Sequence, residues 1–512
     1  MNIFSPDDIV KTVIGLKIFS PYIPSKPNKR RIMPEDKKKK KNPGQKLLAS
    51  LPSMTVLLQN DEVVNLIAEY PERYVQKCLR EILDDTRQKI LKGKITDAEQ
   101  TPDISDVISL ARKRVKAGLG NKIMRVINGA GVILHTGLGR AALSDSALDA
   151  LTEASTRYSL LATDRDSGKR GDRFSHTDEL LCELTGAEAS LVVNNNSAAV
   201  MLALNTFGAG KESIVSRGEL VEIGGAFRIP DVMERSGTIM VEVGTTNKTH
   251  LRDYRNAITE ETSLLLKVHT SNYRIEGFHG EVGEAEMSAL AREKNLITVM
   301  DLGSGAMVDI RRWGVAHEPT VPQAVKDGMD IITFSGDKML GGPQCGILIG
   351  KKELIAQMKV NPLMRAFRCG KLTLSALNGT LRLFLNPDTL PQTHPVYEMI
   401  GTPMDVIKLR AQRLARRLRA IEGFKEAIDI SIGTGLTEMG SGSLPARGIA
   451  THVVAMTPKA CSAENLSTAL RQATPPLFTR IEEEQVKIDA RTITDKEVVW
   501  IGEVMREVLG RI

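Results

Sequence analysis

The chain is poor in aromatic residues and contains no long hydrophobic run. Phe, Trp and Tyr make up 4% of its 512 residues, which argues against a single-strand nucleic-acid binder that stacks bases on exposed rings. No apolar run approaches the ~20 residues that a membrane helix needs, so no membrane partner is expected. The first 22 residues include Asp7 and Asp8 and lack a small-residue cleavage site, so we expect no secretory signal.

Cysteine is also scarce, and its spacing excludes the common metal-binding patterns. The five cysteines are Cys78, Cys182, Cys345, Cys369 and Cys461, and no two of them form a C-x-x-C pair. We therefore expect no metal site built on cysteines. Widely separated cysteines of this kind are typical of reduced thiols, which indicates a cytoplasmic protein.

Positive charge is abundant only at the N-terminus. The net charge of the chain is +7, yet residues 1–46 alone contain 12 Lys+Arg and 4 Asp+Glu. The remaining residues are thus almost neutral overall. A segment rich in lysine and proline cannot bury enough apolar surface to fold, so residues 1–46 are predicted to be a flexible extension. It is either a solvated tail without a role or a region that attracts a polyanion such as RNA.

The rest of the sequence divides into three segments by its hydrophobic pattern. Residues 47–120 carry apolar residues at helical spacing, which predicts a helical N-terminal domain. In residues 121–390, short apolar runs alternate with helical stretches, which is typical of a large, mostly parallel sheet covered on both faces. Residues 391–512 predict a small C-terminal α/β domain. The predicted fold class is α/β.

Lys338 lies where one of these apolar runs ends. The run 331–334 passes into a short polar turn that contains Ser335 and Lys338 and is followed by glycines. A lysine amine can condense with an aldehyde, and a constrained loop at a strand end would present it to a bound cofactor. By itself, however, Ser-x-x-Lys is more often a surface lysine in a hairpin.

Two further strand ends strengthen the interpretation of Lys338 as a cofactor anchor. Residues 194–199 form a strand–helix junction of small polar residues, where backbone N–H groups can bind phosphate, although Asn and Ser also cap helices for structural reasons. Asp301 ends the apolar run 296–300. A carboxylate there can keep a pyridine nitrogen protonated, although it can equally be a simple turn residue. A phosphate loop, an aspartate and a lysine in this order are more specific than any one of them.

The same sequence words resemble the fold-type-I pyridoxal-phosphate enzymes, and among them the bacterial L-seryl-tRNA(Sec) selenium transferases. The resemblance runs from about Leu47 to the C-terminus. It is carried by several long words, which are residues 127–140, 168–173, 184–188, 194–196, 217–225, 269–275, 301–305, 335–338 and 440–445.

The resemblance implies a role for each of nine residues. Lys338 would hold pyridoxal 5'-phosphate covalently, and Asp301 would pair with the ring nitrogen of the cofactor. Four side chains would surround its phosphate, namely Asn195, Asn196, Ser197 and Ser335. Three arginines would face the anionic selenium donor, namely Arg140, Arg365 and Arg368, because guanidinium groups bind phosphate oxygens bidentately. Without the resemblance, Arg365 and Arg368 read as helix-surface residues.

The resemblance also implies a reaction and partners. The protein would convert L-seryl-tRNA(Sec) to L-selenocysteinyl-tRNA(Sec) with selenophosphate, by β-elimination to an aminoacrylyl-tRNA followed by addition of selenium. Residues 47–120 would bind the tRNA, and the protein would assemble as a ring of dimers. Because the serine carboxylate is esterified to the tRNA, no arginine is needed to bind it, unlike in an aminotransferase.

Five positions depart from the family pattern, and they keep two other functions open. The departures are Gly137, Ala162, Ser197, Gly370 and Asn378. The first alternative is a pyridoxal-phosphate lyase or related enzyme that acts on a free amino acid or a phosphorylated sugar acid, which would not need residues 47–120. The second is a non-catalytic RNA-binding protein, against which Lys338 and Asp301 argue.

Overall fold

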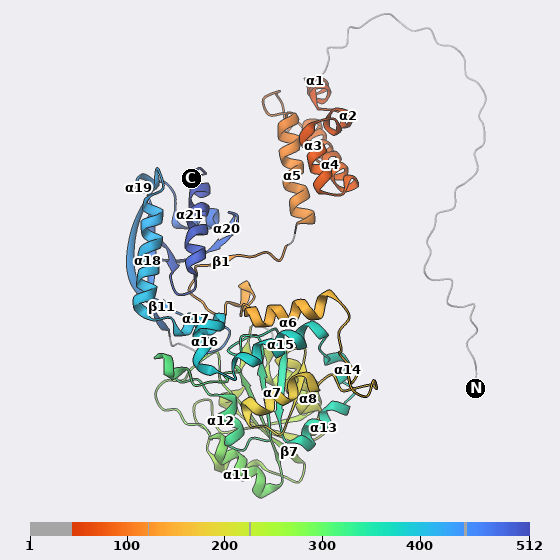
Figure 1. The fold of residues 1–512 in the computed structure, drawn as a ribbon, viewed down its shortest axis with the longest axis vertical. Helices are drawn as coiled ribbons and strands as arrows, with labels where there is room; N and C mark the ends of the chain where they lie inside the picture. Colours follow the sequence, from red (N-terminus) through yellow and green to blue (C-terminus); the bar gives the residue numbers. More distant parts are fainter. Residues whose placement is uncertain (1–42, 121, 225–226, 445–447, 512) are drawn as a thin grey trace, which may run out of the picture. The chain divides into compact units, whose positions relative to one another are not determined.

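A computed structural model describes residues 43–120, 122–224, 227–444 and 448–511 of the chain. The extension predicted for residues 1–46 therefore lies almost wholly outside the described residues. The chain divides into two compact units, with the boundary between Met124 and Arg125 (Figure 1).

The first unit is a small helical bundle. Its helices are α1 (Pro43–Ser50), α2 (Met54–Leu58), α3 (Asp61–Glu69), α4 (Glu72–Leu91) and α5 (Ile104–Leu119). The apolar positions of α4 recur every three or four residues, so Val75, Leu79 and Ile82 lie on one buried face against the same core as α5. Helix α5 begins at a capping box, in which Asp103 and Asp106 each accept a backbone N–H of the other.

The second unit is built on a seven-stranded sheet in the order β2-β10-β9-β8-β7-β3-β6. The strands are β2 (Ala189–Val193), β3 (Glu212–Ser216), β6 (Ile239–Val243), β7 (Thr262–Val268), β8 (Ile297–Gly303), β9 (Ile331–Ser335) and β10 (Gly346–Gly350). Strand β10 is antiparallel to both of its neighbours, whereas the neighbouring pairs among β6, β3, β7, β8 and β9 are parallel. The predicted α/β class with a large, mostly parallel sheet is confirmed.

Helices cover both faces of this sheet. They are α6 (Asp145–Thr156), α7 (Ser175–Thr185), α8 (Asn196–Gly208), α9 (Ile229–Ser236), α10 (Leu251–Ala257), α11 (Glu284–Lys294), α12 (Val321–Lys326), α13 (Lys352–Val360), α14 (Met364–Phe367), α15 (Lys371–Leu383), α16 (Leu390–Thr393) and α17 (Pro395–Gly401). Because successive strand residues point to opposite faces, Val192 belongs to a buried cluster that includes residues of α7, α11 and α15, whereas Leu191 and Val193 belong to another with residues of α8, α9 and α13. Both faces are thus buried, which accounts for the continuous apolar runs.

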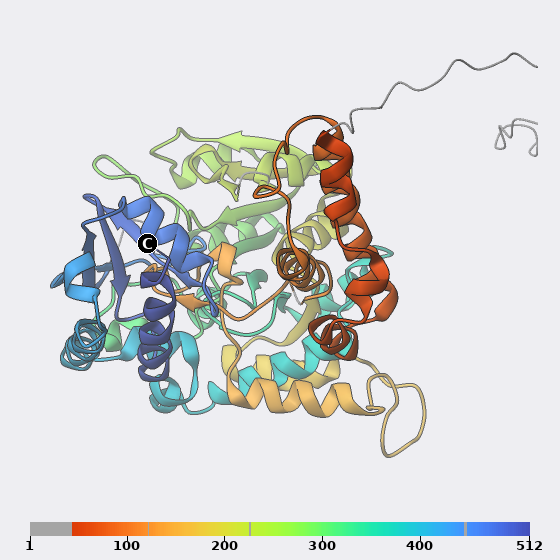
Figure 2. The ribbon, with the colours of Figure 1, turned by 90° about the horizontal axis from the view of Figure 1, so that it is seen from above.

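The C-terminal part of this unit forms a second sheet in the order β11-β12-β15-β14. Its elements are α18 (Met404–Arg419), α19 (Phe424–Ala427), β11 (Ile428–Thr437), β12 (Ile449–Pro458), α20 (Ala463–Arg471), β13 (Leu477–Phe478), β14 (Arg480–Glu482), β15 (Gln485–Asp489) and α21 (Asp495–Leu509). Helices α18, α20 and α21 bury their apolar faces against this sheet. Figure 2 shows this part in blue beside the green strands of the large sheet.

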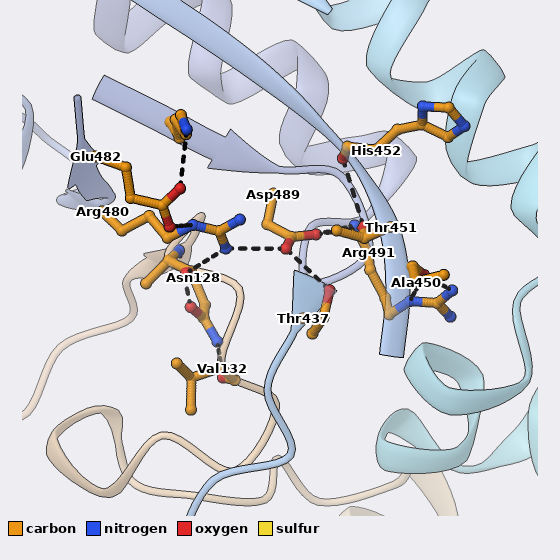
Figure 3. A network of polar contacts seen from close by, with 12 residues as sticks. Asn128, Val132, Thr437, Ala450, Thr451, His452, Arg480, Glu482, Asp489 and Arg491 are labelled. Atoms are coloured by element: carbon orange, nitrogen blue, oxygen red, sulfur yellow. Dashed lines mark hydrogen bonds and ion pairs between the residues drawn. The ribbon is translucent and has the colours of Figure 1, made fainter. Parts of the chain in front are cut away.

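The segment that follows the boundary is attached to this C-terminal sheet. Strand β1 (Ile127–Asn128) pairs in parallel with β13, and Val132 bridges to Glu438. Figure 3 shows the polar network that fixes the attachment. The fully buried carboxylate of Asp489 accepts hydrogen bonds from Thr437, Thr451, Arg480 and the backbone of Arg491, and Arg480 also donates to the carbonyl of Ala130. A buried carboxylate requires such partners, because a buried charge is costly unless it is hydrogen-bonded and paired.

Among the residues described, no helix is long and apolar enough to cross a membrane.

Candidate active site

Lys338 lies in the connection between β9 and β10. The two strands form an antiparallel pair, so the hairpin is real. The connection folds inward, however, and leaves Lys338 only 6% exposed. Backbone hydrogen bonds from Gly336 to Cys345, from Gly341 to Lys338 and from Gly342 to Gly336 close the loop at 2.9, 2.9 and 2.7 Å. Lys338 therefore lies in a hairpin, but it is not a surface residue.

Asp301 lies on β8, the strand next to β9. It is 4% exposed. Its Oδ1 atom accepts a hydrogen bond from Asn196 Nδ2 at 2.8 Å and another from Thr333 Oγ1 at 3.3 Å. No hydrogen bond from a described residue reaches Oδ2, which leaves this oxygen available for a ligand.

Lys338 and Asp301 face the same small space. A methyl group added to Gly303 would lie 3.8 Å from both Lys338 Nζ and Asp301 Oδ1, and Gly303 has a φ of +68° that favours glycine. Burial lowers the pKa of the Lys338 amine, and Arg140 lowers it further, although Asp301 opposes both effects. Burial raises the pKa of Asp301, against the effects of Asn196 and Lys338. A cation bound to Asp301 would favour its charged form.

The predicted phosphate-binding residues lie at the N-terminus of α8 and at the end of β9. Asn195 caps α8, because its side chain accepts the N–H of Ala198 at 2.9 Å. Asn196 instead directs its amide to Asp301, and Ser197 occupies the first turn of α8. Ser335 ends β9 and is 6% exposed. The helix N-terminus thus offers the free N–H groups that bind a phosphate.

These residues fit the cofactor that the resemblance implies. A buried amine, a buried carboxylate and a helix N-terminus match the aldehyde, ring nitrogen and phosphate of pyridoxal 5'-phosphate. Two buried polar atoms nearby, Asn196 Oδ1 and Ser304 Oγ, have no hydrogen-bond partner among the described residues. Buried polar atoms without partners are uncommon in proteins, and a ligand in this space would give them partners.

The structure places Arg140 beside Lys338. Arg140 Nη1 forms an ion pair with Asp337 Oδ2 at 2.7 Å, and its backbone adopts a left-handed φ of 63°. Asp337 precedes Lys338 directly, so the ion pair holds the arginine at the lysine loop. Asp337 was not identified from the sequence, although its position next to a candidate cofactor lysine was a usable signal.

Arg365 and Arg368 lie at a different edge of the site. Arg368 bridges to Val193 at the end of β2, and Asn194 donates its N–H to Phe367 at 2.9 Å, so both arginines flank the loop that leads into α8. Arg173 donates to the carbonyl of Cys369 at 3.4 Å. The guanidinium of Arg173 lowers the pKa of Arg368, and burial, Arg365 and Arg170 add to this effect.

These four arginines form a cluster without a carboxylate partner among the described residues. In contrast, Arg140 is already paired with Asp337. Mutual repulsion between guanidinium groups costs free energy that a bound anion would recover. The family resemblance pointed to Arg365 and Arg368 but not to Arg170 and Arg173, which lie far away along the chain.

His269 and Glu318 complete the site and were not identified from the sequence. His269 directly follows β7 and donates its backbone N–H to the carbonyl of Asp301 at 2.9 Å. Its Nε2 atom lies 3.5 Å from Oε1 of Glu318, which is 2% exposed. His269 follows a predicted strand just as Asp301 ends one, so the rule that ligands gather at strand ends was an available signal.

Within the described residues, no three His, Cys, Asp or Glu side chains are grouped so that they could hold a metal ion.

A solved structure shares this fold. Over 78% of this chain and 98% of its own, D-glucosaminate-6-phosphate ammonia-lyase matches with a TM-score of 0.54 and 20% sequence identity. At this identity the likeness establishes the fold alone.

Sequence relatives are much more similar. The L-seryl-tRNA(Sec) selenium transferase of Carboxydothermus hydrogenoformans is 46% identical over 464 residues, which cover 90% of this chain and 98% of the relative. The same-named protein of Alkaliphilus metalliredigens is also 46% identical, over 466 residues that cover 90% of this chain and 99% of the relative. A family model described as SelA, L-seryl-tRNA selenium transferase, matches residues 126–494. The chain belongs to the L-seryl-tRNA selenium transferase family.

Proposed function

We propose that this protein is a pyridoxal-phosphate-dependent enzyme that converts L-seryl-tRNA(Sec) to L-selenocysteinyl-tRNA(Sec). The proposal is carried by family membership together with one structural observation. Lys338 and Asp301 are both buried at neighbouring positions of the sheet edge, on either side of the space at Gly303. Burying an amine and a carboxylate is costly even where the two partly compensate each other, so their joint presence favours a functional site.

The cofactor would be held by residues from three elements. Lys338 would bind it covalently, Asp301 would pair with its ring nitrogen, and the N-terminus of α8 would bind its phosphate. The phosphate site would include Asn195, Asn196, Ser197 and Ser335. When bound, pyridoxal 5'-phosphate acts as an electron sink for the negative charge that develops when an α-proton is removed.

Lys338 would then act on the seryl group as the base that takes the α-proton. Burial lowers its pKa, so more of the amine is unprotonated near neutral pH and can accept a proton. Loss of the β-hydroxyl leaves an unsaturated acyl group on the tRNA, and selenium adds to its β-carbon. The seryl carboxylate is an ester in this substrate, so the arginines of the site remain available for another anion.

That anion would be selenophosphate, which donates the selenium. Arg365 and Arg368 lack carboxylate partners among the described residues, and they are held next to the loop into α8. Arg140 would join them when its ion pair with Asp337 opens. Multiply charged phosphates are bound well by several guanidinium groups, because each can donate two hydrogen bonds.

The helical unit would bind the tRNA, and the protein would work in the cytoplasm as a homo-oligomer. These assignments follow the family. The cytoplasmic location agrees with the five cysteines, all of which are free. The basic residues within 1–46 would add electrostatic attraction to RNA.

A turnover experiment with matched variants tests the proposal. The purified protein should carry a chromophore from its covalently bound cofactor and should convert seryl-tRNA(Sec) with selenophosphate. Lys338→Ala should abolish both, whereas Lys352→Ala, which changes an exposed lysine, should retain both. Bound cofactor without turnover of the tRNA substrate, together with release of ammonia from free amino acids or phosphorylated sugar acids, would instead identify a lyase.

A further inference from the structure

We propose that His269, held in place by Glu318, is the acid that protonates the β-hydroxyl of the seryl group as it leaves. The inference rests on the proposed function and deepens it. Hydroxide is a poor leaving group, so the elimination needs a proton donor at the β-oxygen as well as a base at the α-carbon.

Hydrogen bonds to different segments of the second unit anchor the two residues. His269 is anchored by its backbone hydrogen bond to Asp301 at 2.9 Å. Glu318 precedes α12, and its Oε2 atom accepts the backbone N–H of Leu444 at 3.2 Å. The remaining oxygen, Oε1, lies 3.5 Å from His269 Nε2. Glu318 therefore has one oxygen fixed by the backbone and one directed at the imidazole.

The facing atoms have no other partner among the described residues. His269 Nε2 and Glu318 Oε1 are both buried, and neither makes a hydrogen bond that meets normal geometry. A buried carboxylate oxygen is costly unless a donor satisfies it. A hydrogen bond from Nε2–H to Oε1 would satisfy both atoms and would fix the tautomer and the orientation of the ring.

The pair also lies within the electrostatic reach of the catalytic groups. His269 lowers the pKa of Asp301, and Glu318 raises the pKa of Lys338. Each effect is small beside that of burial. His269 also acts on Glu281, which is ion-paired with Lys267. Glu281 is thus already compensated, which leaves Glu318 as the free acidic partner of the imidazole.

The imidazole is accessible from a cleft. His269 and Glu318 line a cleft of about 600 Å³ that is also bordered by Thr270, Tyr273 and Leu444. The His269 side chain is 20% exposed, whereas that of Glu318 is 2% exposed. Nε2 of the ring thus faces the buried carboxylate, while another part of the ring borders the cleft.

The proton balance of the step is complete. Lys338 takes the α-proton of the seryl group, and the protonated His269 gives its outer proton to the β-oxygen. The C–O bond breaks, water leaves, and a double bond forms between the α- and β-carbons. His269 is left neutral, with its inner N–H on Glu318, and recovers a proton from solvent through the cleft. Lys338 and His269 are thus the base and the acid of one elimination.

The experiment compares two leaving groups in His269→Gln, Glu318→Gln and a control. With seryl-tRNA, elimination by His269→Gln should fall by about 10²–10⁴-fold, the usual contribution of a general acid. With 3-chloroalanyl-tRNA, whose chloride leaves without a proton, the variant should stay within a few-fold of the wild type. Glu318→Gln should show the same pattern more weakly. His317→Gln, an exposed histidine in the same cleft, should match the wild type with both substrates.

Exchange of the α-hydrogen separates this inference from the proposed function. Seryl-tRNA labelled with tritium at the α-carbon should lose tritium to water in the wild type and in His269→Gln at similar rates, because Lys338 performs that step. Equal losses of elimination with both leaving groups, or no loss with seryl-tRNA, would overturn the role of His269. Absence of tritium exchange in the wild type would instead overturn the proposed function.

Discussion

Two lysines are buried in or next to the large sheet, Lys338 and Lys267, and only Lys338 has a role in the proposed chemistry. Lys267 on β7 is buried with Glu219, and its Nζ atom lies 3.2 Å from Glu219 Oε1 and 3.0 Å from Glu281 Oε2. Burial alone would lower the pKa of Lys267, but the two glutamates outweigh it and raise the pKa above its usual range. The raised pKa favours the protonated form of Lys267, whereas burial lowers the pKa of Lys338, so we assign Lys267 a role in stability.

We predict that Lys267→Met destabilises the protein by roughly 3–5 kcal/mol, the usual cost of leaving one member of a buried ion pair alone. Glu219 would then keep a buried carboxylate whose main cation is gone. Urea unfolding followed by circular dichroism measures the change. The double variant Lys267→Met/Glu219→Gln should recover part of the loss, and the idea fails if the double variant is as unstable as the sum of the two single variants.

A buried histidine beside the lysine loop predicts a pH effect on stability. His394 is 1% exposed, donates one hydrogen bond from Nε2 to the carbonyl of Leu340 at 3.0 Å, and packs edge-on against Tyr397. Burial lowers its pKa from 6.5 to about 4. As the pH falls, His394 therefore becomes protonated near pH 6.5 in the unfolded chain but only near pH 4 in the folded protein.

Stability should consequently fall as the pH drops through this window, by about 2–3 kcal/mol from His394 alone. Other groups also respond to acid, so His394→Gln provides the comparison. Urea unfolding of both proteins at about pH 7 and about pH 4.5 isolates the contribution. The wild type should lose more stability than the variant, and equal losses would show that His394 is not neutral in the folded state.

The site residues that could be predicted are those that end apolar strands. Asp301 and Lys338 follow runs that any parallel sheet would place at one edge. His269 follows such a run too, but Glu318 reaches it from a loop before α12, and no periodicity relates the two. Similarly, the sequence did not indicate that the side-chain amide of Asn196 donates a hydrogen bond to Asp301, because a side-chain direction at a helix start depends on tertiary contacts.

At the scale of elements, the pattern of apolar runs predicts the parallel strands but not β10. Strand β10 begins and ends with glycine. It follows the lysine loop too closely for a crossover connection, which a parallel strand would need. It pairs antiparallel between β2 and β9. The attachment of β1 to β13 was likewise not predictable, because a two-residue strand carries no periodicity.

Strand β10 matters to the site because Gly346 lets the loop into α8 approach it. A methyl group at Gly346 would lie 2.1 Å from the carbonyl oxygen of Asn195 and 2.8 Å from the N–H nitrogen of Asn196. Both distances are too short, and the obstructing atoms belong to the backbone. The junction would have to shift, together with the amide that holds Asp301.

We therefore predict that Gly346→Ala weakens cofactor binding by tenfold or more, an effect of about 1.4 kcal/mol. Cofactor titration followed by absorbance measures the affinity. Gly433→Ala is the matched control, since Gly433 also lies in a strand and the nearest atom to its added methyl group is 3.9 Å away. Equal affinities of the two variants would contradict the proposed position of the phosphate.

At the scale of the whole molecule, charge and chemistry occupy different parts of the chain. The excess of positive charge lies within residues 1–46, whereas the buried lysine and aspartate lie in the large sheet. The polyanionic substrate of the proposed reaction carries its reactive seryl group at one end. A basic segment from another part of the chain can thus raise the local concentration of substrate without acting on the reacting atoms.

Deleting residues 1–42 should consequently weaken binding of tRNA while leaving the chemical step unchanged. The deleted residues contain 11 of the 12 basic residues found in 1–46. Each lysine or arginine that contacts a phosphate releases a counterion, so the logarithm of affinity should fall less steeply with salt after the deletion. Affinity measured by filter binding over a range of salt concentrations tests this expectation, and single-turnover rates at saturating tRNA provide the control.

A variant with eleven neutral glutamines in place of these lysines and arginines should behave like the deletion, because the effect depends on charge and not on length. An unchanged affinity and salt slope would instead assign the segment to the solvated tail without a role in binding.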